Sequence, residues 1–279
     1  MAHLALQQKT NLSSFRRIAI GTWQNAYDPS VYGSLTVRVD KTLDYLEKFR
    51  KATGRRLTIS HMMAKLASHV MREVPDANAI MRFNRIYLRR DVGVFFQVAM
   101  EDEKTGELDL SGTVIYDADK KSLVDIVDEF EAKVKKVRDH KDESLEHTRS
   151  TFKMIPFLLL NWVLKIISFF SYTLNLDLRW AKIPADPFGS VMVTNVGSLG
   201  LDVAYPPLVP YSRVPLLIAT SAVKEAPVVE NGKVVVGNVM HVCATFDHRI
   251  LDGAHAAPMS AIIRSWLEDP QAHFGPIPE

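Results

Sequence analysis

The chain has 279 residues, of which 47% are hydrophobic and 24% are charged, and its formal net charge is +2. This length suffices for one large domain or two small ones, and the near-neutral charge argues against a dedicated nucleic-acid-binding protein. The single cysteine, Cys243, excludes an internal disulfide framework and fits a reducing, cytoplasmic compartment, and no secretory signal peptide is visible.

Periodicity in the first half of the chain predicts a mixture of helices and strands. Apolar residues at helical spacing predict helices over residues 13–27, 41–53, 58–74 and 117–139. Alternating or continuous apolar runs predict strands over residues 32–40, 85–88 and 92–100. Gly54 and Pro75 are the expected stop signals of the second and third helices.

The second half adds strands over 191–195, 216–223 and 239–246, and a last helix over 253–267. Helices separated by groups of strands predict an α+β fold, that is, a mixed α/β two-layer sandwich, rather than a regular doubly wound sheet. No glycine fingerprint of a dinucleotide site or a P-loop is present.

One segment, MIPFLLLNWVLKIISFFSYTLNL at 154–176, is unusually apolar. Its polar residues fall in one stripe roughly 80° wide on a helix; they are Asn161, Lys165, Ser168, Tyr172 and Asn175. The favoured interpretation is a core or subunit-interface helix, and the alternative is insertion at a membrane surface or against a hydrophobic partner. A transmembrane span is disfavoured, because Lys165 near mid-span would cost about 3 kcal/mol.

A second stretch, TFDHRILDGAHAA at 245–257, concentrates five ionisable residues; they are Asp247, His248, Arg249, Asp252 and His255. A metal site is disfavoured, because a strand pattern runs into His248 and a helix begins near Gly253, so the possible ligands do not share a helix face. A structural interpretation makes Asp252 a helix N-cap and Asp247 with Arg249 a turn pair. A catalytic interpretation makes His248 a base that titrates near neutral pH. The residue types alone leave these last two interpretations open.

The segment FDHRILDGA resembles the His-x-x-x-Asp-Gly motif of the dihydrolipoamide acyltransferase catalytic domains of 2-oxo acid dehydrogenase complexes, within the chloramphenicol acetyltransferase-like superfamily. VMVTNVGSLG at 191–200 is similar to the family's strand with the pattern Ser-Asn-x-Gly-x-x-Gly. Further similarity at 15–20, 67–81 and 117–130 extends the resemblance over nearly the whole chain. It implies a chloramphenicol acetyltransferase-like fold over 1–279 as one catalytic domain, with an apolar helical insertion at 152–182 that contains the extra helix at about 154–176.

The resemblance also implies a mechanism and its substrates. CoA or acyl-CoA would be a substrate, and the acyl group would move between CoA and a thiol acceptor such as dihydrolipoamide carried by another protein. His248 would deprotonate the thiol, and the hydroxyl of Thr194, which stands where the family has serine, would stabilise the oxyanion. Asp252 would be an orienting residue paired with Arg16 or Arg17, between which the sequence does not choose.

The family builds its site between subunits of a trimer, so Thr194 and His248 are expected from different chains of a homotrimer. No bound metal and no covalent lipoyl group are expected on this chain, and CoA-binding residues are not identified. Lipoyl and subunit-binding domains are not visible upstream, and the region 104–116 is more polar than its family counterpart. The end of the chain lacks the family's apolar hook, which predicts a trimer rather than a cage unless 154–176 supplies a further contact.

Two rival functions remain at this point. One is a catalytically weak or inactive scaffold that oligomerises and binds a partner or a membrane through 154–176. The other is an antibiotic-type acetyltransferase with a hydroxyl acceptor, which the similarity over 191–248 makes less favoured. The predicted location is cytoplasmic, and peripheral to a membrane if 154–176 binds one.

Overall fold

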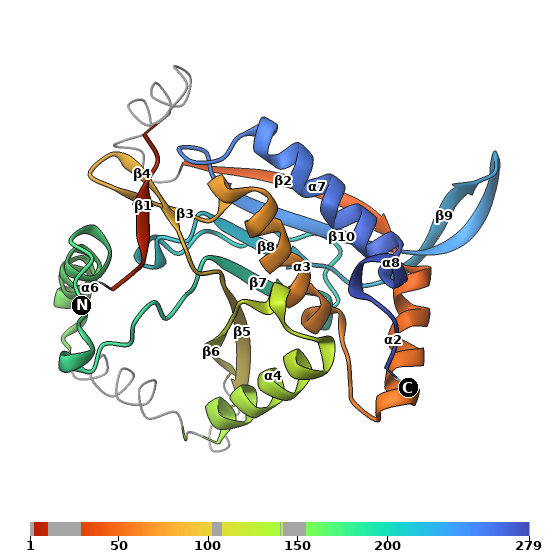
Figure 1. The fold of residues 1–279 in the computed structure, drawn as a ribbon, viewed down its shortest axis with the longest axis horizontal. Helices are drawn as coiled ribbons and strands as arrows, with labels where there is room; N and C mark the ends of the chain where they lie inside the picture. Colours follow the sequence, from red (N-terminus) through yellow and green to blue (C-terminus); the bar gives the residue numbers. More distant parts are fainter. Residues whose placement is uncertain (1–2, 11–28, 102–107, 140, 142–154, 279) are drawn as a thin grey trace.

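The computed structural model describes residues 3–10, 29–101, 108–139, 141 and 155–278 (Figure 1). The α-helices are α2 (Asp40–Thr53), α3 (Ile59–Glu73), α4 (Leu123–Arg138), α6 (Phe157–Ser168), α7 (Gly253–Glu268) and α8 (Pro270–Phe274). The strands are β1 (Leu6–Gln8), β2 (Ser30–Arg38), β3 (Ala79–Arg82), β4 (Arg85–Arg89), β5 (Gly93–Glu101), β6 (Leu108–Tyr116), β7 (Val191–Asn195), β8 (Leu216–Thr220), β9 (Lys224–Glu230) and β10 (Lys233–Asp247). Short helical turns are η1 (Pro75–Ala77), η2 (Ala118–Lys120), η3 (Phe169–Thr173), η4 (Arg179–Ala181), η5 (Gly197–Leu199) and η6 (Pro210–Ser212).

A mixed seven-stranded sheet organises the molecule, in the order β2-β10-β8-β7-β5-β6, with β9 paired to β10. β7 lies parallel to β5 and to β8, whereas β10 runs antiparallel to β2, β8 and β9. β8 is buried along its whole length, as expected for a central strand covered on both faces. The β9–β10 ribbon projects from the body at one end of the molecule (Figure 1).

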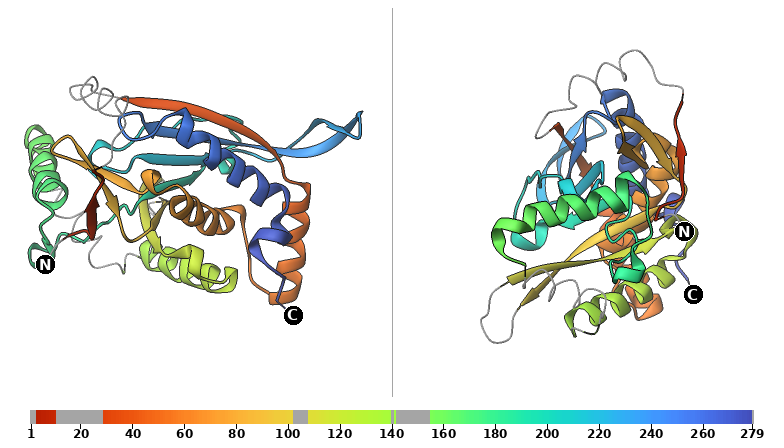
Figure 2. Two further views of the ribbon diagram at one scale, coloured as in Figure 1. Left: turned by 45° about the horizontal axis from the view of Figure 1, so that its top comes forward. Right: turned by 90° about the vertical axis from the view of Figure 1, so that its left-hand side faces the viewer.

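Helices cover one face of this sheet and build the main apolar core. α2, α3, α4 and α7 all contact its strands, and Figure 2 (left) shows them on the same side. Leu216 and Ile218 of β8 join this core, whereas Leu217 and Ala219 alternate to the opposite face. There a smaller cluster packs beneath loop residues such as Phe188. Helices over a largely antiparallel sheet confirm the predicted α+β class.

Most predicted elements are present, with shifted boundaries. α2 ends where predicted, because Gly54 adopts the left-handed conformation (φ 68°) that favours glycine and donates to the carbonyl of Arg50. The predicted helix 117–139 begins later, at Leu123, because Asp117 is left-handed and Ser122 caps α4 by accepting from the amide of Asp125. The strands β1, β3 and β9 were not predicted. The predicted helix 13–27 lies outside the described residues.

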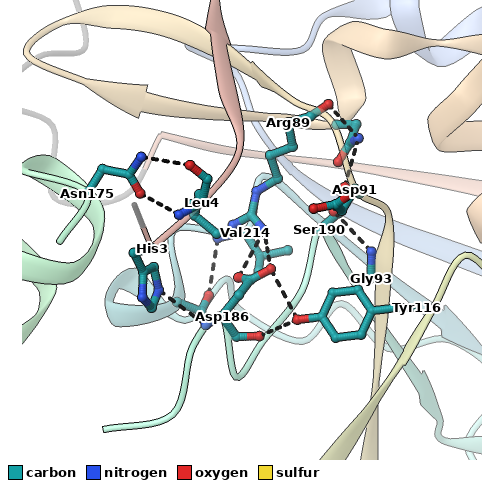
Figure 3. A network of polar contacts seen from close by, with 12 residues as sticks. His3, Leu4, Arg89, Asp91, Gly93, Tyr116, Asn175, Asp186, Ser190 and Val214 are labelled. Atoms are coloured by element: carbon teal, nitrogen blue, oxygen red, sulfur yellow. Dashed lines mark hydrogen bonds and ion pairs between the residues drawn. The ribbon is translucent and has the colours of Figure 1, made fainter. Parts of the chain in front are cut away.

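A smaller sheet, β1-β4-β3, is joined to the segment after α6 by a buried polar network (Figure 3). Arg89 of β4 donates from Nη1 to both carboxylate oxygens of Asp186, at 2.9 and 2.8 Å, and its side chain is only 3% exposed. The hydroxyl of Tyr116 donates to the carbonyl of Asp186 at 2.9 Å. The amide of Asp186 donates to Nε2 of His3, whose pKa is lowered chiefly by burial. The network thus ties the N-terminal strand and the two sheets to one loop.

The apolar segment forms a helix, but a shorter one than the predicted 154–176. α6 begins at Phe157 and ends at Ser168, and a π-helical turn, η3, follows. Its outward face carries exposed apolar side chains, including Trp162 at 65% and Ile166 at 53%. A core role for that face is therefore wrong within this chain. No helix in the described part of the chain is long and apolar enough to cross a membrane.

Candidate functional site

His248 lies just beyond the end of β10, in a tight turn anchored in the core. Its Nδ1 is 2.9 Å from the carbonyl oxygen of Leu251, and its amide donates to the carbonyl of Pro29 at 3.0 Å. The neighbouring Ile250 and Leu251 are 2% and 0% exposed, so the turn cannot swing freely. A carbonyl only accepts hydrogen bonds, so Nδ1 must carry the hydrogen, which makes Nε2 the atom that can take a proton.

Asp252 ends this turn and begins α7. Its Oδ1 accepts from the amides of Ala254 at 2.9 Å and His255 at 3.3 Å, so the predicted N-cap is confirmed. Asp252 directly follows Leu251, so the cap adjoins the peptide whose carbonyl contacts His248.

His255 takes part in an ionic chain that the sequence did not reveal. Its Nδ1 is 2.7 Å from Oδ1 of Asp252, and its Nε2 is 3.1 Å from Oδ2 of Asp76. Each ring nitrogen of His255 thus faces a carboxylate oxygen, which only accepts hydrogen bonds. The hydrogen bond from His255, helped by Lys9, lowers the pKa of Asp76 to about 2 against the effect of burial. The cap residue is thus linked to η1 through His255.

Asp247 and Arg249 form the turn pair expected from the sequence. Arg249 donates from Nε to Oδ1 of Asp247 at 2.9 Å, and its own amide donates to the same oxygen at 2.9 Å. Of the other ionisable residues in this stretch, Asp252 is hydrogen-bonded to His255, and His248 to the backbone carbonyl of Leu251. Among the described residues, no three side chains of ligand type converge as metal ligands would.

Thr194 lies near the C-terminal end of β7. Its hydroxyl donates to Oε1 of Gln97 on β5 at 3.3 Å, a partner that the sequence did not indicate. The turn after β7 requires glycine at position 197 for steric reasons, because a Cβ there would lie 2.4 Å from the carbonyl oxygen of Ser221. This close approach of backbones holds the end of β7 against the end of β8.

The register of the sheet separates Thr194 from His248. Thr194 pairs with Ala219 of β8, and Ala219 pairs with Cys243 of β10. His248 therefore lies five residues (248 − 243) beyond the level of Thr194 along β10. At about 3.3 Å per residue and about 4.8 Å between strands, the two residues are well over 10 Å apart. One chain does not bring the predicted base and the predicted hydroxyl together.

The predicted orienting arginines, Arg16 and Arg17, lie outside the described residues. The region 104–116 is described from Leu108 onward, as β6 at the edge of the sheet beside β5.

Comparison with protein families gives one match that covers most of the chain. The model of the 2-oxoacid dehydrogenases acyltransferase (catalytic domain) matches residues 6–155 and 187–274. The segment that carries α6, η3 and η4 lies between these two matched parts.

Curated relatives agree with the family match. The chain is 25% identical over 80% of its length to the lipoamide acyltransferase component of the branched-chain alpha-keto acid dehydrogenase complex of Bacillus subtilis. It is also 25% identical over 95% of its length to the dihydrolipoyllysine-residue acetyltransferase component of the acetoin cleaving system of the same organism. These matches cover 42% and 56% of the two relatives, so the chain spans about half the length of the curated relatives it matches.

Solved structures share the fold. A probable dihydrolipoamide acetyltransferase from Listeria monocytogenes matches with a TM-score of 0.65 at 18% identity, covering 94% of this chain and 95% of the other. A truncated catalytic core of the 2-oxoacid dehydrogenase multienzyme complex from Thermoplasma acidophilum matches with a TM-score of 0.61 at 21% identity, covering 95% and 99%. With the family match over both the Thr194 and the His248 segments, the chain belongs to the family of 2-oxoacid dehydrogenase acyltransferase catalytic domains.

Proposed function

We propose that this chain transfers an acyl group between CoA and a thiol acceptor, with His248 as general base. The observation that carries the proposal is the contact of Nδ1 with the carbonyl of Leu251, which leaves Nε2 as the basic nitrogen. Membership of the acyltransferase family gives the reaction class. One relative is named a dihydrolipoyllysine-residue acetyltransferase. This name supports dihydrolipoamide on a separate lipoyl-bearing protein as the acceptor.

The steps follow from thioester chemistry. Nε2 of His248 takes the proton of the attacking thiol, and the thiolate sulfur forms a bond to the thioester carbonyl carbon. The hydroxyl of Thr194 donates to the resulting oxyanion. When the intermediate collapses, the bond to the leaving sulfur breaks, and that sulfur takes the proton back from His248. Both CoA and the acceptor are thiols, so the same groups serve transfer in either direction.

The site is proposed to lie between two subunits. The sheet register that separates Thr194 from His248 supports this arrangement, because a single chain presents each residue without the other. Exposed apolar residues beside the end of β7 also support a neighbouring chain there; Leu199 is 71% exposed, Leu201 45% and Val203 46%. A homotrimer is the proposed assembly. A solved structure of similar fold is described as the cubic core of the pyruvate dehydrogenase multienzyme complex. Measurement of the oligomer mass should therefore test for an assembly larger than a trimer.

Asp252 is proposed as a positioning residue. It caps α7 and fixes the turn that orients His248, and its pairing with Arg16 or Arg17 remains part of the proposal. The cytoplasmic location likewise stays a prediction.

The test is acyl transfer by the purified protein, from a panel of acyl-CoAs to dihydrolipoamide. His248→Ala is expected to lower the rate roughly 10²–10⁴-fold, the range typical of general acid–base catalysis. His241→Ala is the matched control, because His241 lies on β10, the strand that leads to His248, and contacts Thr36 rather than the turn. A wild-type rate no higher than that of His248→Ala over the whole panel would refute the proposed enzymatic function. It would favour the scaffold hypothesis, with which the replacement of the family's serine by Thr194 is compatible.

A further inference from the structure

A stripe of large apolar side chains runs along the outward face of α6 and into η3. Its members are 41–65% exposed; they are Leu159, Trp162, Ile166, Phe169 and Phe170. At about 100° per residue, this spacing confines them to an arc roughly 100° wide. Figure 2 (right) shows α6 lying across one end of the molecule, on the side that faces the viewer.

The end of this segment is held by hydrogen bonds to distant parts of the chain. Ser168 is 4% exposed, and its hydroxyl accepts from Nε of Arg213 at 3.1 Å. The carbonyl of Thr173 accepts from Nε of Arg82 at 2.9 Å. Asn175 exchanges two hydrogen bonds with the backbone of Leu4. These contacts anchor the end of α6 and the residues that follow it, while the stripe stays exposed.

A second apolar group follows at the same end of the molecule. Leu176 is 44% exposed, and Trp180 of η4 is 83% exposed. η4 follows α6 and η3 in the chain. Two exposed tryptophans therefore accompany the stripe, and tryptophan is the residue most typical of membrane–water interfaces.

The charged residues of this segment are mostly cationic. From Ile155 to Lys182 the sequence has three cationic residues, Lys165, Arg179 and Lys182, and one acidic residue, Asp177, a local net charge of +2. The side chain of Asp177 is 12% exposed, and Arg179 binds its carboxylate. The ammonium group of Lys165 lies 5.4 Å from the ring centroid of Trp162, so its apolar stem follows the stripe while its charge stays at the border.

We propose that the α6 stripe and the Trp180 turn form a membrane-binding surface that lies in the plane of an anionic bilayer. A convex helix with aromatic and aliphatic side chains outward, bordered by cations, matches the headgroup–acyl boundary of such a bilayer. Burial of the stripe removes apolar area from water, while Lys165 and Lys182 meet lipid phosphates. The surface attaches the chain to one leaflet, independently of the acyl-transfer site.

The test is co-sedimentation of the full chain with vesicles of phosphatidylcholine, with and without phosphatidylglycerol. Trp162→Glu with Ile166→Glu changes two exposed positions, so the fold is expected to persist. This pair is expected to lower partition onto the anionic vesicles at least roughly tenfold. Lys48→Glu is the control: it makes the same change in net charge on α2, at the opposite end of the molecule, and is expected to leave partition near the wild-type level.

Three results would overturn the proposal. The first is wild-type protein that stays in the supernatant with both vesicle types. The second is a double variant that binds vesicles as well as the wild type does. The third is a wild-type oligomer that the double variant dissociates, which would mean that a second copy of the chain covers the stripe. If the double variant does not fold, quenching of wild-type tryptophan emission by brominated anionic lipids decides, and its absence refutes membrane contact.

Discussion

Thr194 and His248 stand at opposite ends of one sheet, since Thr194 is level with Cys243 of β10 and His248 follows five residues later. The separation comes from topology rather than from side-chain conformation. β10 runs antiparallel to β8, so the end of β10 meets the start of β8, whereas β7 runs parallel to β8 and ends beside its end. No rotamer change within one chain brings the two groups into contact.

Mixing two inactive variants tests whether neighbouring subunits share the site. Thr194→Val and His248→Ala should each be nearly inactive, because one lacks the hydroxyl and the other lacks the base. When the two are coexpressed at equal levels, random assembly gives about a quarter of the sites both functional residues, as expected for a head-to-tail ring. Activity is measured on the copurified mixture, with separately purified and merely pooled proteins as the control. A mixture as inactive as its components would assign both residues to one chain.

Two variants separate the capping role of Asp252 from the role of its negative charge. Asp252→Ala removes the acceptor for the amide of Ala254 and should cost about 1 kcal/mol of stability. Asp252→Asn keeps an oxygen acceptor and should unfold near the wild-type temperature. Under the proposed pairing of the carboxylate with Arg16 or Arg17, both variants should lose acyl-transfer activity. Thermal unfolding and kcat measured together separate these effects, and an Asp252→Asn variant with full kcat would limit the residue to capping.

His61 should make stability fall as the pH drops from 6.5 to 4. Burial, more than the nearby arginines, lowers the pKa of His61 from 6.5 to about 4, and the side chain is 2% exposed. In that window the unfolded chain binds a proton that the native state does not. Unfolding is therefore favoured by up to about 3 kcal/mol as the pH falls, and this effect levels off below pH 4.

The measurement is urea unfolding across this window for the wild type and His61→Gln. Glutamine can replace His61 in the capping box with Thr58, which keeps α3 capped. The variant should lose this part of the pH dependence. The carboxylate of Asp76, with a pKa of about 2, contributes only at lower pH, as its stabilisation is lost from pH 3.8 downward. Equal slopes for the two proteins between pH 6.5 and 4 would contradict the assignment.

The buried pair Arg89–Asp186 should behave as a coupled unit. Asp186→Asn leaves the guanidinium of Arg89, 3% exposed, without its charge partner and should cost about 3–5 kcal/mol. Arg89→Met should be similarly destabilising, because it leaves a buried carboxylate. The double variant removes both charges and should be more stable than the sum of the single effects predicts. Urea unfolding of all four proteins measures this coupling, and strictly additive changes would show that the two charges act independently.

Local signals explain why α2 and α3 could be predicted from the sequence. Gly54 stops α2 by its own conformational freedom, and Thr58 with His61 caps the start of α3. The end of α6 has no comparable signal in its own residues. There, Ser168 binds Arg213, which is distant in sequence, and a π-helical turn follows. Asn175, after this turn, binds the backbone of Leu4.

In the candidate site, too, local features could be predicted from the sequence, whereas contacts between distant residues could not. Asp252 could be predicted as a cap because Gly253 and a helical period follow it directly. The link from His255 to Asp76 could not, because 179 residues separate the partners and only the packing of α7 near η1 joins them. Family resemblance supplied Thr194, and its observed partner, Gln97, depends on the pairing of β5 with β7.

Because His248 and Thr194 lie at opposite ends of the sheet, the activity should depend on assembly of the subunits. Under the proposed two-chain site, an isolated subunit has every residue that the reaction needs and still has no complete centre. Dilution should then inhibit the enzyme. Specific activity should fall once the protein concentration drops below the dissociation constant of the subunits, although each subunit stays folded. A cell could regulate such an enzyme through its abundance alone, with no allosteric ligand and no change in conformation.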